Sequence, residues 1–88
     1  AILKQYKKLF LMEGVELEFD KFSLNSIVEK KKKKKTGARA LRSIVEEFML
    51  DIMYELPNRK DVSKCVITKD VVDKNEEPIF IKAEKKSA

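Results

Sequence analysis

The amino-acid sequence predicts an α+β domain of about three helices packed with a short three-stranded sheet. In three segments the apolar residues recur every three or four positions, which is typical of helices with one buried face. In three shorter segments, branched and aromatic residues indicate half-buried strands. With 88 residues the chain has room for one modest core. We therefore expect one domain over residues 1–82 and a disordered charged tail over 83–88.

The first helix is predicted over residues 1–12. Ala1 offers no capping oxygen, so we expect the chain to be a piece of a longer one. Gly14 ends the helix, and the alternation that follows predicts a strand over 15–19. The residues expected to be buried are Ile2, Leu3, Tyr6, Leu9 and Phe10 in the helix and Val15, Leu17 and Phe19 in the strand.

A second helix is predicted from residue 21 to about residue 34, with Asp20 as its N-cap. Its apolar stripe would continue at Lys31 and Lys32, so the second half has nothing apolar to bury. We expect it to project, to fray, or to lie over the core only by the methylene stems of its lysines. The residues assigned to the buried stripe are Phe22, Leu24, Ile27 and Val28.

The strongest helix pattern runs from a cap at Thr36 to Pro57, which stops the helix. Beyond it we expect a strand over 64–68, a short turn or helix over 70–73 capped by Thr68, and a last strand over 79–81. The residues assigned to packing in the long helix are Leu41, Ile44, Val45, Phe48, Met49, Ile52, Met53, Tyr54 and Leu56.

Composition excludes several kinds of site. The chain has no histidine and one cysteine, so it contains neither a His/Cys zinc site nor a Ser-His or Cys-His pair. Cys65 is expected to be a buried small hydrophobe. The two glycines, Gly14 and Gly37, are too far apart for a phosphate-binding glycine loop. We therefore expect no catalytic residue and no metal ligand, and no apolar segment is long enough to span a membrane.

The net charge of +5 comes from one run of six lysines, Lys30 to Lys35, because the rest of the chain carries −1. One interpretation is a nucleic-acid or anionic-surface binding module. The other is a solvated helix end, which we favour because no aromatic residue lies within the run to stack on bases.

Arg39 stands at the start of the long helix, where the dipole favours an acidic residue. A bound phosphate would resolve this conflict, since free N–H groups and Arg39 together attract an anion. The alternative is an exposed arginine, or one paired with Glu13, Glu16 or Glu18. On electrostatics alone we favour the alternative, because a basic residue at a helix start costs only a few tenths of a kcal/mol. Arg42 and Glu46, four positions apart, are expected to form a surface pair.

Two segments then reveal a resemblance. LKQYKKLFLMEGVELEF (residues 3–19) and TGARALRSIVEEFMLDIMYELP (residues 36–57) resemble the C-terminal small, or lid, domain of the ClpX family of AAA+ unfoldases, in order over about residues 1–82. The family usually has small or apolar residues near Lys31 and Lys32, where this chain departs from the pattern.

The resemblance implies that Arg39 is the sensor-2 arginine, which reaches the phosphates of ATP or ADP, with Gly37 and Ala38 lining the nucleotide. Mg would be bound by a large domain outside this chain, as would the residues that hydrolyse ATP. The implied partners are the large domains of the same and neighbouring subunits in a hexameric ring, a Clp peptidase and protein substrates. The implied location is a reducing compartment, the bacterial cytoplasm or an organelle matrix, with no membrane partner.

Overall fold

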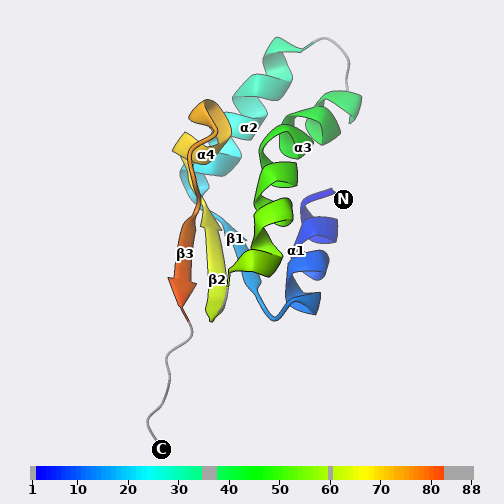
Figure 1. Cartoon of the computed structure of the whole chain (residues 1–88). Helices are drawn as coiled ribbons and strands as arrows, with labels where there is room; N and C mark the ends of the chain where they lie inside the picture. Colours follow the sequence, from blue (N-terminus) through cyan, green and yellow to red (C-terminus); the bar gives the residue numbers. More distant parts are fainter. Residues whose placement is uncertain (1, 35–37, 60, 83–88) are drawn as a thin grey trace, which may run out of the picture.

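The computed structural model describes residues 2–34, 38–59 and 61–82. It confirms an α+β domain with one three-stranded sheet, shows that the short element expected over 70–73 is a helix, and adds a 3-10 turn (Figure 1). The elements in chain order are α1 (Ile2–Met12), β1 (Glu16–Phe19), α2 (Lys21–Lys33), α3 (Ala38–Glu55), the 3-10 turn η1 (Leu56–Asn58), β2 (Val62–Ile67), α4 (Lys69–Lys74) and β3 (Ile79–Lys82).

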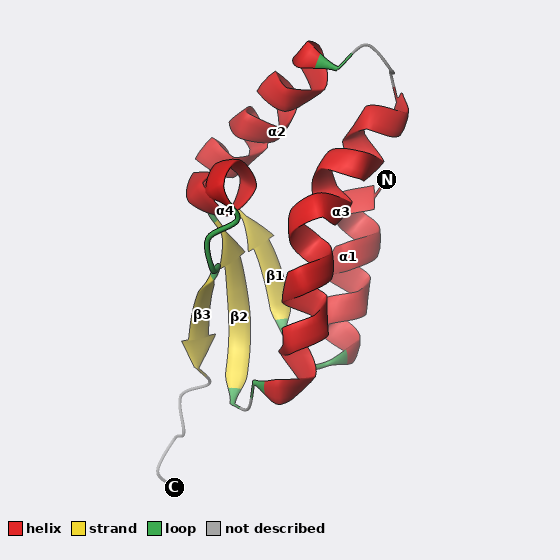
Figure 2. Ribbon diagram, turned by 45° about the horizontal axis from the view of Figure 1, so that its top comes forward, coloured by secondary structure: helices red, strands yellow, loops and turns green. Residues whose placement is uncertain are grey.

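The sheet has the strand order β1-β2-β3, with β1 parallel to β2 and β2 antiparallel to β3. Leu17 lies opposite Cys65, which in turn lies opposite Phe80. The parallel pair requires a long crossover connection, which α2 and α3 provide. Helices α1 and α3 lie side by side on one side of the sheet, whereas α2 and α4 pack together at one end (Figure 2).

The end of α1 shows why Gly14 stands where it does. Its φ of 75° is in the left-handed region, which glycine adopts without steric cost. The Gly14 N–H donates to the Leu11 carbonyl and the Val15 N–H donates to the Phe10 carbonyl, both at 2.9 Å. These two bonds satisfy carbonyls at the helix end and turn the chain directly into β1.

The core is built around one face of α3. Every buried residue of this face belongs to one hydrophobic cluster, which also contains buried residues of α1, β1, α2, β2 and α4. Met49 is fully buried, which confirms its assignment, but Tyr54 is 84% exposed and its assignment to packing was wrong. Leu9 was also assigned wrongly, since α1 buries only Ile2, Tyr6 and Phe10. The buried residues of α3 are Ala40, Ile44, Val45, Phe48, Met49 and Ile52.

Helix α2 buries a different face from the one predicted. Asp20 is the N-cap, as expected, and accepts from the Ser23 N–H at 2.6 Å. The buried residues of α2 are Ser23, Ser26 and Ile27, whereas Phe22, Leu24 and Val28 are exposed. The prediction failed because the two serines find partners: Ser23 Oγ donates to the Asp20 carbonyl and Ser26 Oγ to Asp73 of α4.

The same face explains the first lysine of the run. Lys30 Nζ donates to the Val72 carbonyl at 2.6 Å. Val72 lies in the last turn of α4, where carbonyls lack partners within the helix, so Lys30 satisfies one of them. Lys31 to Lys34 are exposed. The expectation that the second half of α2 has nothing to bury therefore holds only after Lys30.

The remaining predictions have mixed outcomes. Cys65 is buried, as predicted. Thr68 is the N-cap of α4, but its side chain makes no capping hydrogen bond. The cap at Thr36, the end of the lysine run at Lys35 and the tail over 83–88 lie outside the described residues.

No helix within the described ranges is long and apolar enough to cross a membrane.

The two kinds of lysine in α2 predict different effects on stability. Lys30→Ala should lower the free energy of unfolding by about 1–2 kcal/mol, because the Val72 carbonyl loses a charged donor. Lys32→Ala should change it by less than about 0.5 kcal/mol, because the pair with Glu29 is exposed. Urea titrations followed by circular dichroism measure both values, and equal effects would contradict the assigned role of Lys30.

Burial gives a second prediction, on the reactivity of Cys65. Loss of solvent raises the pKa of the Cys65 thiol from 9.0 to about 12, although the positive charge of Arg59 opposes the shift. A rise of this size leaves about 1,000-fold less thiolate at pH 8 than an ordinary cysteine has. Iodoacetamide should therefore alkylate the native chain very slowly at pH 8 and rapidly in urea. Mass spectrometry of the two reactions checks this, and similar rates would show that the thiol is accessible.

Candidate functional site

The candidate site is the first turn of α3. Arg39 is the second residue of this helix and is exposed. The first turn contains no acidic residue, so the positive end of the helix dipole and the guanidinium lie together. Among the residues that the structure describes, no carboxylate lies within salt-bridge distance of Arg39. The turn is therefore suited to an anion from outside the chain.

A shallow hollow of about 560 Å³ lies beside Arg39. It is also lined by Arg42, Ser43 and Glu46. Arg42 Nη1 lies 3.3 Å from Glu46 Oε1, which confirms the predicted surface pair. Of the two arginines that line the hollow, Arg39 is therefore the one without a carboxylate partner among the described residues.

The predicted alternative partners of Arg39 lie elsewhere. Glu18 pairs with Lys64 on the neighbouring strand at 3.2 Å. Glu13 and Glu16 are exposed, and neither forms a salt bridge with a described residue. The alternative of an ion-paired Arg39 was thus wrong, while that of an exposed Arg39 agrees with the structure.

The other two predicted nucleotide-binding residues are only partly described. Ala38 is the first residue of α3, so its backbone belongs to the same turn as Arg39. Gly37 lies outside the described residues. Their assignment to a nucleotide site remains a prediction.

Helix α1 packs beside this part of α3. Tyr6 of α1 is buried, and loss of solvent is the main reason why the pKa of its hydroxyl is raised. The charge of Glu46 raises this pKa further, and the charge of Arg42 lowers it. The buried ring of Tyr6 therefore lies close enough to the Arg42–Glu46 pair to feel both charges. Tyr6 thus lies near two of the residues that line the hollow, Arg42 and Glu46.

The exposed lysines of α2 form a second charged feature. Lys32 pairs weakly with Glu29, at 3.8 Å, and Lys31, Lys33 and Lys34 have no carboxylate partner among the described residues. Exposed lysines of this kind attract anions without selecting one. The nucleic-acid or anionic-surface hypothesis remains untested.

As for a metal site, no group of three or more acidic, cysteine or histidine residues in the described ranges is arranged to hold an ion.

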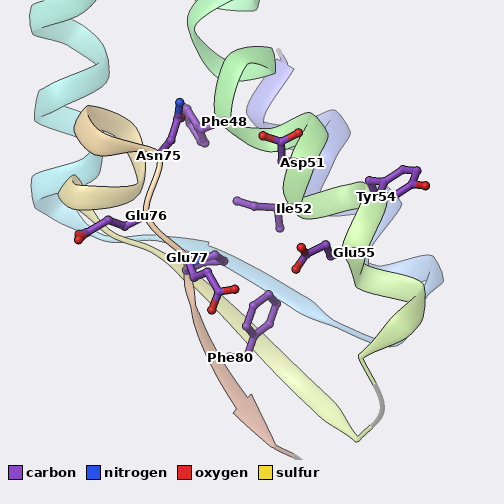
Figure 3. Close-up of a pocket in the computed structure, with 10 residues that line it drawn as sticks. Phe48, Asp51, Ile52, Tyr54, Glu55, Asn75, Glu76, Glu77 and Phe80 are labelled. Atoms are coloured by element: carbon purple, nitrogen blue, oxygen red, sulfur yellow. The ribbon is translucent and has the colours of Figure 1, made fainter.

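One surface was missed by the sequence analysis. It is a pocket of about 270 Å³ between the second half of α3 and the segment that leads into β3 (Figure 3). Its lining includes Asp51 and Glu55 of α3, Glu76 and Glu77 of the segment before β3, and Phe80 of β3, and the Glu76 carboxylate points away from α3. The signal in the sequence was Tyr54, an aromatic residue that was assigned to packing and is exposed instead.

Comparison with known proteins identifies relatives of the chain. Residues 1–71 match the family model of the C-terminal, D2-small domain of ClpB protein. The chain is 44% identical, over 82 residues and 92% of its length, to the ATP-dependent Clp protease ATP-binding subunit ClpX of Borrelia duttonii (strain Ly). The identity and coverage are the same for the ClpX subunit of Borrelia recurrentis (strain A1).

The chain spans 19% of the length of each of these ClpX subunits. The family match covers most of the chain, including α1, the sheet strands β1 and β2, and α3 with Arg39. The ClpX relatives confirm the resemblance seen in the two sequence segments. The chain belongs to the Clp family of C-terminal small domains, whose family model is the D2-small domain of ClpB.

Proposed function

We propose that the chain is the C-terminal small domain of a ClpX-like, ATP-dependent protein unfoldase, and that it covers and senses bound nucleotide through Arg39. The observation that carries this proposal is the exposed guanidinium on the first turn of α3, without a carboxylate partner among the described residues. The ClpX relatives, which are named as ATP-binding subunits, support the choice of a nucleotide as the missing anion.

The donors present fit a phosphate group. A guanidinium offers several N–H groups in a fixed plane, which suits the oxygens of a phosphate, and the unpaired N–H groups of a helix start add to the attraction. The residues of this chain that would contact the nucleotide are Arg39, with Ala38 and Gly37 beside it. They offer no oxygen ligand suited to Mg, so the ion would be held by other parts of the protein.

The fold would also transmit the state of the nucleotide. Arg39 is part of α3, whose inner face is buried in the core, so the helix and the sheet are expected to move as one body. A change at the phosphates would then rotate the small domain as a whole. In the proposed hexameric ring, this rotation would reach the large domains of the same and neighbouring subunits, and through them a peptidase and its protein substrates.

The decisive variant is Arg39→Ala in the full-length protein. Loss of a charged hydrogen bond costs about 1.5–3 kcal/mol, which is about a ten- to hundredfold loss of the interaction. We expect ATP-driven substrate unfolding to fall by at least about tenfold, while the small domain keeps its circular dichroism spectrum. Arg39→Lys should recover only part of the activity, because lysine lacks the planar donor group.

Lys32→Ala is the matched control, because it also removes one exposed positive charge but lies outside the first turn of α3. It should leave unfolding activity unchanged. Normal activity of Arg39→Ala, or equal losses in the two variants, would overturn the role of Arg39.

A further inference from the structure

Strand β3 forms one edge of the sheet and presents apolar side chains to solvent (Figure 1). Leu17, Cys65 and Phe80 lie in register across the sheet and belong to or pack against the core. Because side chains alternate along a strand, the two neighbours of Phe80, Ile79 and Ile81, point to the opposite face of the sheet. These two residues are 52% and 44% exposed.

The other two strands place mostly polar residues on this open face. Glu16 and Glu18 of β1 are exposed, and Lys64 of β2 pairs with Glu18 at 3.2 Å. A sheet with one open face usually carries polar side chains there, so β3 is the exception. Val66 of β2 is half-buried and lies opposite Ile79, which extends the apolar area inward from the edge. A contiguous exposed apolar area of this kind marks a surface suited to contact with another polypeptide.

The outer edge of β3 also offers backbone hydrogen-bonding groups. Ser63 Oγ of β2 donates to the Ile81 carbonyl at 3.2 Å, so this carbonyl faces β2. The backbone groups of successive strand residues point to alternate sides. The N–H and the carbonyl of Phe80 therefore face away from β2, toward the free edge.

The pairing on the other side of β2 leads to the same assignment. The Asp20 N–H donates to the Ile67 carbonyl at 3.0 Å, so this carbonyl faces the β1 side of β2. The backbone groups of Cys65, two positions earlier, point to the same side. They are thus directed away from Phe80, the residue opposite Cys65 in β3. Phe80 offers one donor and one acceptor at the edge, which is a template for a further strand.

Charges at the two ends of β3 favour an antiparallel partner. The segment before the strand contains Glu76 and Glu77, and the strand ends at Lys82. Glu76 and Lys82 are exposed, and the Glu76 carboxylate points away from α3 (Figure 3). An antiparallel copy of the same strand would bring its basic end beside Glu76 and its acidic end beside Lys82. A parallel copy would bring like charges together.

We infer that β3 pairs at its free edge with β3 of a second copy of this chain, antiparallel and with the two Phe80 residues opposite one another. These two residues then exchange both N–H···O bonds. Ile79 lies opposite Ile81 of the second copy, and the reverse, so the four isoleucines form one apolar strip on the open face. Because both copies use the same surface, the assembly closes at a dimer.

Pro78 sets the register of this pairing. Proline and lysine protect the edges of many sheets, but Pro78 and Lys82 flank β3 and leave the three residues between them able to pair. Pro78 lacks an N–H, so a shift that placed it opposite Phe80 would lose a hydrogen bond. The inference does not rest on nucleotide sensing, since Arg39 lies in the first turn of α3.

The test compares two double variants of the 88-residue chain by sedimentation equilibrium. In Ile79→Lys/Ile81→Lys, like charges face one another across the two copies, and the dimer should weaken by at least about tenfold. In Ile79→Glu/Ile81→Lys, opposite charges face one another in the proposed register. This variant should therefore form a dimer at least about tenfold tighter than the first variant does.

The matched control is Leu11→Lys/Met12→Lys. It replaces two exposed apolar residues outside the sheet and has the same net charge as Ile79→Lys/Ile81→Lys. It should form the dimer as the unaltered chain does. Hydrogen exchange tests the proposal without any substitution, because the Phe80 N–H should exchange more slowly as the concentration of the unaltered chain rises. Circular dichroism checks that every variant is folded.

Three results would overturn the inference. The first is a chain that is monomeric at every concentration at which it stays in solution, which would leave this edge to a different partner. The second is equal dimerisation of Ile79→Lys/Ile81→Lys and the control, or growth into species larger than a dimer. The third is a Glu/Lys variant that associates no more tightly than the Lys/Lys variant, which would exclude the antiparallel register.

Discussion

The buried face of α3 is the feature on which the rest of this small domain depends. Its residues form one cluster with side chains from every other helix and from β1 and β2. A domain of this size buries a smaller share of its surface than a large one does, so little other apolar contact is available to stabilise it. Close packing on one helix therefore determines where α1, the sheet and the α2–α4 pair are held.

The same helix carries the candidate site in its first turn and lines the pocket beside β3 with its last turns. Arg39 belongs to the first turn, and Asp51, Tyr54 and Glu55 belong to the last turns. With 18 residues at 1.5 Å per residue, α3 is about 27 Å long. Because its middle is packed in the core, the two ends keep a fixed separation. A ligand bound at the Arg39 end would thus act on one rigid helix.

The sequence was informative wherever the determining interactions are local. The apolar rhythm of residues 38–55, the Asp20 cap and the left-handed Gly14 all depend on neighbours in the chain. It failed on α2, because Ser26 and Lys30 are held by Asp73 and Val72, more than forty positions away. Periodicity does not show such partners, so exposed apolar residues were taken as the buried face.

The candidate sites show the same division. Arg39 could be located from the sequence, because a basic residue in the first turn of a helix conflicts with the local dipole. The pocket between α3 and β3 could not, because it combines the end of α3 with residues 75–78 and with β3. Tyr54 continues a helical pattern of apolar residues, and only the packed structure shows that the core ends before it.

The parallel pairing of β1 with β2 also determines the order in which the chain gains structure during synthesis. Glu16 pairs with Lys64 and Phe19 with Ile67, a separation of 48 positions in both cases. As the chain is made from its N-terminus, β1 is complete long before the strand that satisfies its backbone groups. Contacts this distant form slowly and late. The backbone groups of β1 therefore lack their partners in β2 until Ile67 has been made. The domain then folds as one unit, once most of it has been synthesised.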